Sequence, residues 1–370
     1  MTENRRPRKD VAAFRTLGDL ETEASRAVDG AVWGYIQGGS GDEETLRGNR
    51  EAFRRWTLRP RMLADVRAVD LRTTMLGSPV RAPFFVAPTA YQGEIHPDGE
   101  RGSARAAGKA GVLAVFSTLS SAPLEAIARV VPAGPRWFQL YLQRDFAASV
   151  RLVRRAERSG YSALVVTVDT PVLGSRDRQV RSGFAFSTPV PVGNGVDARS
   201  PPRAAALNGG RYRLPAPADQ TWEVIDRLGT VTKLPIVVKG VLTADDARRA
   251  VDHGARGVVV SNHGGRQLDR APSALDALPE VVTAVGDRAE VYYDGGIRRG
   301  SDVLIALALG ARAVGLGRPV LWALAVGGGS GVERFLALLA ADVATSLALA
   351  GRRSVAELDR SLLGPGTPGP

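Results

Sequence analysis

The sequence predicts an α/β protein built on a (β/α)8 TIM barrel, with an N-terminal helical cap and a long lid loop after the fourth strand. Eight short apolar runs recur along the chain, and stretches with helical spacing separate them. Continuous apolar strands that alternate with helices indicate a parallel sheet covered by helices, and eight such units close into a barrel. A doubly wound open sheet is the alternative. It is disfavoured because no Gly-x-Gly-x-x-Gly motif follows an early strand.

The expected strands are short and rich in β-branched, aliphatic and aromatic residues, as buried parallel strands are. They cover residues 84–87, 112–116, 136–141, 163–169, 235–239, 257–261, 290–294 and 313–317. Between them, apolar residues near helical spacing with a glycine after each stretch predict helices such as 145–159, 243–253 and 300–309.

Three regions lie outside this regular pattern. Residues 1–80 begin with a basic tail, continue with a helix pair at 17–28 and 31–37, and are expected to cap the barrel. The barrel itself should cover residues 81–355, and residues 356–370 should form a C-terminal tail. The segment 170–220 is rich in Pro, Gly, Arg and Ala and is too long for an ordinary connection, so we expect it to be an active-site lid.

Composition narrows the class of protein. The 370 residues include 44% hydrophobic residues, which is enough for a large core, and no cysteine, which excludes disulfides, thiol nucleophiles and cysteine-ligated metals. No uncharged apolar run approaches membrane-spanning length, so a soluble cytoplasmic protein without a membrane partner is expected. The net charge of +11 comes from arginines spread along the chain without interleaved aromatics. This pattern favours anionic small molecules over nucleic acid as partners.

Only three histidines could accept a proton near neutral pH. His96 lies in a helix-entry sequence, where capping is expected, and His253 precedes a glycine at an expected helix C-terminus. His263 follows the strand 257–261 directly and has Arg266 three residues on. It is therefore the candidate catalytic histidine.

Polar side chains gather at the ends of six expected strands, where barrel enzymes keep their active sites. One such residue could be a cap or an ion pair, whereas the whole set indicates a site. The set comprises Gln139, Tyr141, Thr167, Asp169, Lys239, Ser261, His263, Asp294, Gly317 and Arg318.

The last two strands are followed by glycines and arginines. Gly295, Gly296 and Gly317 would let backbone N–H groups approach an anion, and Arg298 and Arg318 could bind phosphate oxygens in a bidentate manner. Two tight turns with solvated arginines are the alternative. Together with the barrel, the pattern predicts a phosphorylated ligand.

Taken together, these motifs resemble the FMN-dependent 2-hydroxy acid oxidases and dehydrogenases, the family of glycolate oxidase, lactate oxidase and mandelate dehydrogenase. The resemblance runs from about residue 17 to 355. Within the family, segments 38–41, 90–92 and 317–323 look most like bacterial hydroxymandelate oxidases. The motifs that carry the family resemblance are residues 87–90, 96–100, 138–141, 167–171, 239–240, 261–269 and 294–296.

The resemblance implies catalytic roles. His263 would accept a proton while the substrate Cα–H bond breaks, and Asp169 would stabilise the imidazolium. Arg266, helped by Tyr35, would clamp the substrate carboxylate, and Tyr141 would hydrogen-bond the substrate hydroxyl. Whether the carbon loses a proton or a hydride stays open.

The substrate side chain would meet two further positions. Arg176 aligns with a lid arginine that enters the site, although Ser175 replaces a second arginine that the family often has. Leu119 stands where glycolate oxidases have a tryptophan, which leaves room for an aromatic group, or it is core packing. Tyr91 and lid residues are expected to line the same pocket.

The implied cofactor is FMN, and no metal is needed. Lys239 would stand beside the flavin N1 and C2 carbonyl, where negative charge gathers on reduction. The full cofactor-binding set implied by the resemblance is Ala87, Pro88, Thr89, Ala90, Ser117, Gln139, Thr167, Lys239, Ser261, Asp294, Gly295, Gly296, Arg298, Gly317 and Arg318.

The expected activity is oxidation of an L-2-hydroxy acid, of the mandelate or 4-hydroxymandelate type, to the 2-keto acid, with O2 as acceptor and H2O2 as product. Lactate or glycolate as substrate, or a quinone as acceptor, are the alternatives. Membrane-bound dehydrogenases of this family carry an apolar insertion in the lid. The lid of this chain is polar and proline-rich instead, which favours O2 as the electron acceptor. A non-redox barrel enzyme would share the phosphate site but would have no use for Lys239, His263 and Arg266 together. The resemblance also implies a homo-oligomer, tetrameric or octameric.

Overall fold

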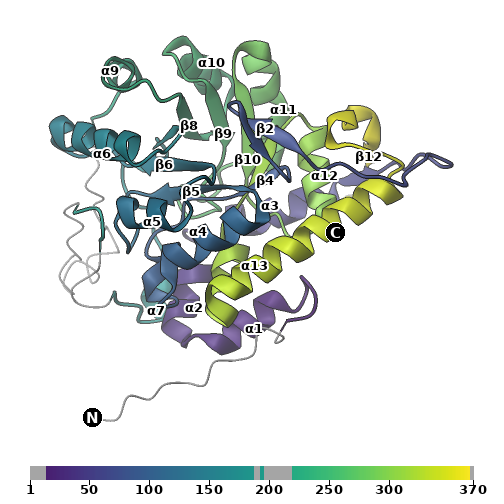
Figure 1. Ribbon diagram of the computed structural model, residues 1–370, viewed down its shortest axis with the longest axis horizontal. Helices are drawn as coiled ribbons and strands as arrows, with labels where there is room; N and C mark the ends of the chain where they lie inside the picture. The colour runs from purple at the N-terminus through teal and green to yellow at the C-terminus, as the bar shows by residue number, and fades with distance from the viewer. Residues whose placement is uncertain (1–13, 187–191, 196–218, 367–370) are drawn as a thin grey trace.

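Eight parallel strands form a closed barrel, which confirms the predicted fold (Figure 1). The computed structural model describes residues 14–186, 192–195 and 219–366, so the basic tail and most of the expected lid lie outside the described residues. Every strand falls within one or two residues of its expected range. Around the barrel the strands are β4 (Phe84–Val86), β5 (Leu113–Ser117), β6 (Arg136–Leu140), β7 (Leu164–Thr167), β8 (Ile236–Val241), β9 (Gly257–Val260), β10 (Glu290–Asp294) and β11 (Ala313–Leu316), which pairs with β4.

Helices follow the strands and surround the barrel (Figure 1). The three expected helices appear as α6, α10 and α12. Asp145 caps α6 by accepting the N–H of Ala147, and Thr243 caps α10 by accepting that of Asp246. The last helix bends where Gly327 and Gly328 leave helical geometry. The helices are α4 (Gly99–Ala110), α5 (Leu124–Val130), α6 (Phe146–Arg158), α7 (Asp177–Arg181), α9 (Glu223–Val231), α10 (Ala244–Asp252), α11 (Ala274–Val285), α12 (Gly300–Ala308) and α13 (Arg318–Leu349).

Side chains alternate along each strand between the barrel interior and the surrounding helices. The residues that face the helices belong to the larger hydrophobic cluster of the protein. The inward-facing residues near the strand starts form a second, separate apolar cluster. Its strand members are Phe85, Leu113, Val115, Trp137, Val165, Val237, Val259, Tyr292 and Ala313, and Ala87 and Ala163 adjoin β4 and β7.

The segment before the barrel is divided between the two ends of the barrel. The expected helix pair is present as α1 (Leu20–Ala27) and α2 (Gly30–Gln37), followed by α3 (Glu44–Arg54). A hairpin of β2 (Thr73–Met75) and β3 (Ser78–Val80), which the sequence pattern does not predict, follows in the chain. Its apolar side chains join the interior cluster at the strand starts, so it closes the end of the barrel away from the mouth.

The C-terminal residues differ from the expected tail. Strand β12 (Leu363–Pro365) pairs antiparallel with β1 (Trp56–Leu58), and Leu362 is fully buried. Because only a few apolar residues carry this contact, the segment shows no periodic pattern that sequence analysis could detect.

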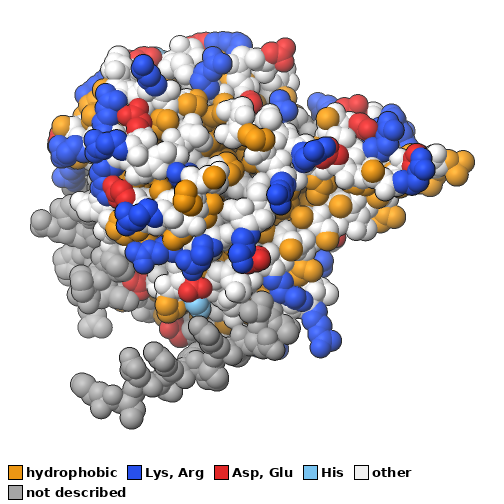
Figure 2. Space-filling model, viewed as in Figure 1, with side chains coloured by type: hydrophobic (Ala, Val, Ile, Leu, Met, Phe, Trp, Pro, Cys, Tyr) orange, Lys and Arg blue, Asp and Glu red, His pale blue; other side chains and the backbone are white. Residues whose placement is uncertain are grey.

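The surface agrees with the interpretation of the charge. On the face in Figure 2, Lys and Arg side chains are scattered among acidic and uncharged ones and do not form a continuous stripe. Among the described residues, no helix combines the length and apolarity needed to cross a bilayer.

Candidate active site

A polar layer of inward-facing side chains lies directly above the apolar layer of the barrel. In six strands, the residue two positions after an apolar inward residue is polar and buried. Because the side-chain period of a strand is two, these residues also face the interior, at the carboxyl ends of the strands. The six are Ser117, Gln139, Thr167, Lys239, Ser261 and Asp294.

One half of this layer is an uncharged hydrogen-bonded chain. Ser117 Oγ donates to Gln139 Oε1 at 2.9 Å, and Gln139 Nε2 donates to Thr167 Oγ1 at 3.0 Å. Each side chain thereby fixes the orientation of the next. This half of the mouth is therefore rigid and presents polar atoms of defined direction.

The other half carries the charges. Lys239 is 5% exposed; its Nζ donates to Ser261 Oγ at 2.9 Å and lies 3.3 Å from Asp294 Oδ2. Burial alone would lower the pKa of Lys239, but Asp294 and then Asp169 outweigh it, so the pKa lies above its usual value. The ammonium group is therefore charged at the bottom of the mouth.

His263 and Asp169 form a half-buried pair beside Lys239. His263 Nδ1 lies 3.0 Å from Asp169 Oδ1. The other ring nitrogen, Nε2, is not engaged by Asp169. Burial lowers the pKa of His263, with Lys239 adding to the effect and Asp169 opposing it. For Asp169, burial acts to raise the pKa, but the interaction with His263, including their hydrogen bond, and the charge of Lys239 outweigh it, so the pKa lies below its usual value. The pair at neutral pH is a neutral imidazole beside a carboxylate.

The backbone around His263 is held in an uncommon conformation. His263, Gly264 and Gly265 have φ values of 58°, 64° and 72°, three consecutive left-handed residues. A non-glycine residue in this region is strained, and such strain collects at functional sites. The turn places the imidazole on Asp169.

Two guanidinium groups meet the C-terminal end of α2. Arg266 Nη1 donates to the carbonyls of Tyr35 and Gly38, and Arg318 Nη2 also donates to Gly38 O, at 2.9 Å. Neither arginine forms an ion pair with an acidic side chain of the described residues. Burial lowers the pKa of Arg266 well below its usual value and that of Arg318 to about 10.

A third buried arginine lies nearby. Arg298 stacks over the ring of Trp322, with its Cζ 4.5 Å from the ring centre, and burial lowers its pKa to about 9. Three positive groups that burial destabilises in one cavity indicate an anionic ligand.

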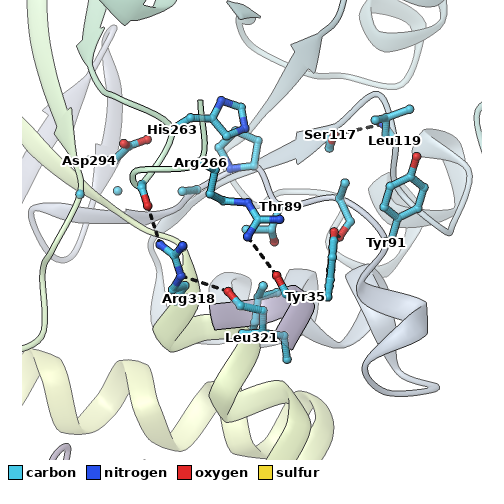
Figure 3. Close-up of a pocket in the computed structure, with 18 of the residues that line it drawn as sticks. Tyr35, Thr89, Tyr91, Ser117, Leu119, His263, Arg266, Asp294, Arg318 and Leu321 are labelled. Carbon is cyan, nitrogen blue, oxygen red and sulfur yellow. Dashed lines mark hydrogen bonds between the residues drawn. The ribbon is translucent and has the colours of Figure 1, made fainter. Parts of the chain in front are cut away.

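Aromatic side chains cover another part of the cavity. Phe184 stacks on Tyr35 with ring centres 4.6 Å apart, and Phe186 lies 4.4 Å from Tyr91. In Figure 3, Tyr91 and Leu119 line the side of the pocket away from Asp294 and Arg318. The cavity therefore has a charged side and an apolar, aromatic side.

Comparison with known proteins identifies the family. The sequence pattern of the FMN-dependent dehydrogenases matches residues 24–365. The chain belongs to the FMN-dependent dehydrogenase family. It is 48% identical to a 4-hydroxymandelate oxidase of Amycolatopsis orientalis, over 92% of this chain and 96% of the relative. It is 44% identical to an L-lactate oxidase of Nostoc sp., over 94% and 97%. A crystal structure of mandelate oxidase with (S)-2-phenylpropionate superposes with a TM-score of 0.87 at 46% identity, covering 96% of this chain and 100% of that one.

FMN, the cofactor of this family, fits the cavity. The cavity, counted together with its open mouth, contains about 1550 Å³ of empty space. A Cβ added at Gly317 would meet nothing within 4 Å, so the backbone there faces open space. Arg298 and Arg318 supply positive charge on the same cavity wall. Glycine backbone and buried guanidinium groups are the donor set that a phosphate needs.

Most of the residues expected from the sequence line this one cavity. Four expected residues do not line the cavity, namely Asp169, Gln139, Thr167 and Ser261. They stand behind the lining residues and form hydrogen bonds that fix the lining residues or one another. The lining members of the expected set are Tyr35, Ala87, Pro88, Thr89, Ala90, Tyr91, Ser117, Leu119, Tyr141, Arg176, Lys239, His263, Arg266, Asp294, Gly295, Gly296, Arg298, Gly317 and Arg318.

The cavity also includes residues that sequence reasoning did not name. The backbone positions among them follow from their places beside named motif residues, but Gln179 and Phe186 lie in the lid, which has no periodic pattern. The additional lining residues are Ile36, Leu173, Gln179, Phe186, Gly264, Ile297, Gly315, Pro319 and Leu321.

The other two histidines do not line the cavity. His253 is the C-cap of α10, lies 2.7 Å from Asp226 Oδ2 and stacks on Trp222. His96 Nδ1 accepts the backbone N–H of Asp98 before α4.

Proposed function

We propose that the protein oxidises an aromatic (S)-2-hydroxy acid, of the mandelate or 4-hydroxymandelate type, to the 2-keto acid with O2. The overall reaction is RCH(OH)COO⁻ + O2 → RCOCOO⁻ + H2O2. The observation that carries this proposal is the cavity itself, which combines the His263–Asp169 pair and Arg266 with an apolar wall that includes Leu119, Tyr91 and Phe186. Such a wall gains contact with an aryl group that a methyl group or hydrogen atom cannot provide.

The family relationship supports both halves of the reaction. The relatives named above are oxidases, which favours O2 as the electron acceptor. The similarity to mandelate oxidase and 4-hydroxymandelate oxidase supports an aromatic acid. The substrates in these names are those of the relatives, and the aromatic substrate proposed for this chain rests chiefly on its own pocket.

His263 accepts the proton that the substrate releases. Its pKa is lowered, so the imidazole is neutral and can act as a base at neutral pH. Asp169, held to Nδ1 at 3.0 Å, orients Nε2 toward the cavity and stabilises the imidazolium that forms. FMN, when bound, takes up the two electrons that leave the substrate carbon.

The substrate is oriented by groups around the histidine. Arg266 binds the substrate carboxylate, because its guanidinium group lines the cavity and has no acidic partner among the described residues. The ring of Tyr35 lies against this group, with its centre 5.3 Å from Arg266 Cζ. Burial raises the pKa of Tyr141, which keeps the phenol protonated, so it can donate to the substrate oxygen. Arg176 from the lid adds positive charge at the same side of the cavity.

The cofactor is held by the polar layer and the glycine–arginine cradle. Lys239 would stabilise negative charge on the reduced flavin. Ala87, Pro88, Thr89 and Ala90 supply the wall after β4. The remaining residues proposed to bind FMN are Ser117, Gln139, Thr167, Ser261, Asp294, Gly295, Gly296, Arg298, Gly317 and Arg318.

A small aliphatic acid is the second candidate, because an L-lactate oxidase matches this chain at 44% identity. The two candidates differ at the apolar wall. Steady-state H2O2 production should give a higher kcat/KM for (S)-mandelate than for L-lactate or glycolate. Leu119→Trp should reduce kcat/KM for mandelate by roughly tenfold more than for lactate, because it overfills the wall. A wild-type preference for lactate, or an equal loss on all substrates, would exclude the aromatic assignment.

A further inference from the structure

Gln179, in the lid helix α7, has a buried side-chain oxygen without a partner among the described residues. The residue is 4% exposed, and its Oε1 has no hydrogen-bond partner among the residues that the structure describes. Buried amides in folded proteins are nearly always hydrogen-bonded. Gln179 lines the cavity, so a ligand that enters the cavity can supply the missing partner. A half-turn about Cγ–Cδ exchanges its donor and its acceptor, so either can face that ligand.

The position of Gln179 indicates which part of the ligand it meets. It follows Arg176 by three residues along the lid, and both line the cavity. On its other side is the C-terminal end of α2, since a Cβ added at Gly38 would lie 3.7 Å from the backbone nitrogen of Gln179. The carbonyl of Gly38 accepts Arg266 Nη1 at 2.5 Å. Gln179 and the Arg266 guanidinium group therefore both adjoin the C-terminal end of α2.

The positive charges around Arg266 favour binding of an anion. Arg266 has no acidic partner among the described residues, and its pKa is lowered by burial and then by Arg176 and Arg318. A bound carboxylate has more acceptor lone pairs than a single guanidinium group can fill. An amide N–H can occupy a further one.

We propose that Gln179 is a substrate-binding residue whose side-chain amide donates a hydrogen bond to the carboxylate that Arg266 binds. The inference rests on the proposed function, because it takes a 2-hydroxy acid as the ligand. The contact is made by the carboxylate, which is unchanged during the reaction. The hydrogen bond therefore stabilises the bound substrate and the transition state equally. Its loss weakens substrate binding without slowing the chemical step.

The experiment compares Gln179→Leu and Gln179→Glu with Val180→Ala in the FMN-loaded enzyme. Val180 is the next residue of the same helix and is 43% exposed, so it controls for changes in α7. Rapid-mixing anaerobic flavin reduction gives the apparent Kd and the limiting rate for (S)-mandelate and for L-lactate. Binding of benzoate, a carboxylate that cannot be oxidised, is followed by the change in the flavin spectrum.

We expect Gln179→Leu to raise the Kd of all three carboxylates by roughly tenfold, with the limiting reduction rate within about twofold of wild type. Gln179→Glu should raise Kd at least tenfold further, because a carboxylate side chain repels the anion and pairs with Arg266. The Val180→Ala enzyme should match wild type. FMN affinity should be unchanged in all three variants.

Three results would overturn the proposal: an unchanged Kd in Gln179→Leu, a loss confined to the aromatic acid, or a loss of FMN affinity with normal carboxylate binding. The last two would assign the amide to the substrate side chain or to the cofactor. Failure of the proposed function looks different. In that case no 2-hydroxy acid reduces the wild-type flavin, while the benzoate titration still tests Gln179.

Discussion

The two ends of the barrel use the same strands for different purposes. At the closed end, the inward residues are apolar and pack under the β2–β3 hairpin, with Tyr292 in edge-to-face contact with Phe85 and Trp137. Two residues further along the same strands, at the mouth, stand Lys239, Asp294 and their polar neighbours.

The difference lies in residue type alone. The strand geometry, the period of two and the degree of burial are the same at both ends. The closed end gains stability from apolar contact, whereas the mouth keeps buried charges and left-handed backbone that weaken the fold but create chemistry. Changes at the closed end should therefore alter stability with little effect on catalysis, and changes at the mouth should do the reverse.

The largest effect is expected for His263→Asn. An amide cannot accept the substrate proton, so the rate of anaerobic flavin reduction should fall by roughly 10²–10⁴-fold. FMN binding and the free energy of unfolding should stay near wild type, because asparagine tolerates the left-handed conformation that His263 adopts. A loss below about a hundredfold would remove His263 as the base.

The reciprocal change at the closed end is Met75→Ala. Met75 is fully buried in the interior cluster, so its truncation should lower the free energy of unfolding by about 2–5 kcal/mol. Denaturant unfolding measures this value, and kcat/KM of the folded enzyme should change by less than about twofold. If Met75→Ala alters catalysis as strongly as stability, the two ends are not independent.

Arg266→Met tests whether the buried arginines bind ligands. Removing the carboxylate clamp should reduce kcat/KM by roughly a hundredfold, through a higher KM and, because the clamp also orients the reacting carbon, a slower reduction. The free energy of unfolding should change little, because the loss of the hydrogen bonds to the Tyr35 and Gly38 carbonyls is offset by the removal of a guanidinium group whose charge burial destabilises. Normal kinetics in this variant would place the clamp elsewhere.

The smallest effect is the pH dependence of reduction. Burial lowers the pKa of His263 below its ordinary value of about 6.5, so the imidazole is mainly neutral at pH 7 and above. The reduction rate should be nearly flat between pH 8 and 7 and should fall in more acidic solution, by up to about tenfold per pH unit. A rate that already declines between pH 8 and 7 would contradict the neutral, buried imidazole.

The sequence predicted the mouth better than the closed end. His263, Asp169 and Lys239 end apolar runs, and a charged residue after a buried strand is visible without a structure. The hairpin was missed because only a few apolar residues, chiefly Met75 and Val80, carry its contact and give no periodic signal.

The lid was expected from the sequence, but its individual contacts were missed for a related reason. The segment around Gln179 and Phe186 is recognisable only as a long irregular loop, and its contacts with Tyr35 and Gly38 join residues about 140 positions or more apart in the chain. Likewise, Asp269 accepts the N–H of Thr45 at the start of α3, a helix cap supplied from a distant loop. Local patterns do not contain such pairings.

Anaerobic mixing of the FMN-loaded enzyme with (S)-mandelate tests the central claim most directly. The account predicts that the oxidised flavin absorbance bleaches in a single turnover, that O2 then restores it, and that each turnover yields one H2O2 and one benzoylformate. A flavin that stays oxidised in the presence of (S)-mandelate, L-lactate and glycolate alike would contradict a 2-hydroxy acid site at the barrel mouth.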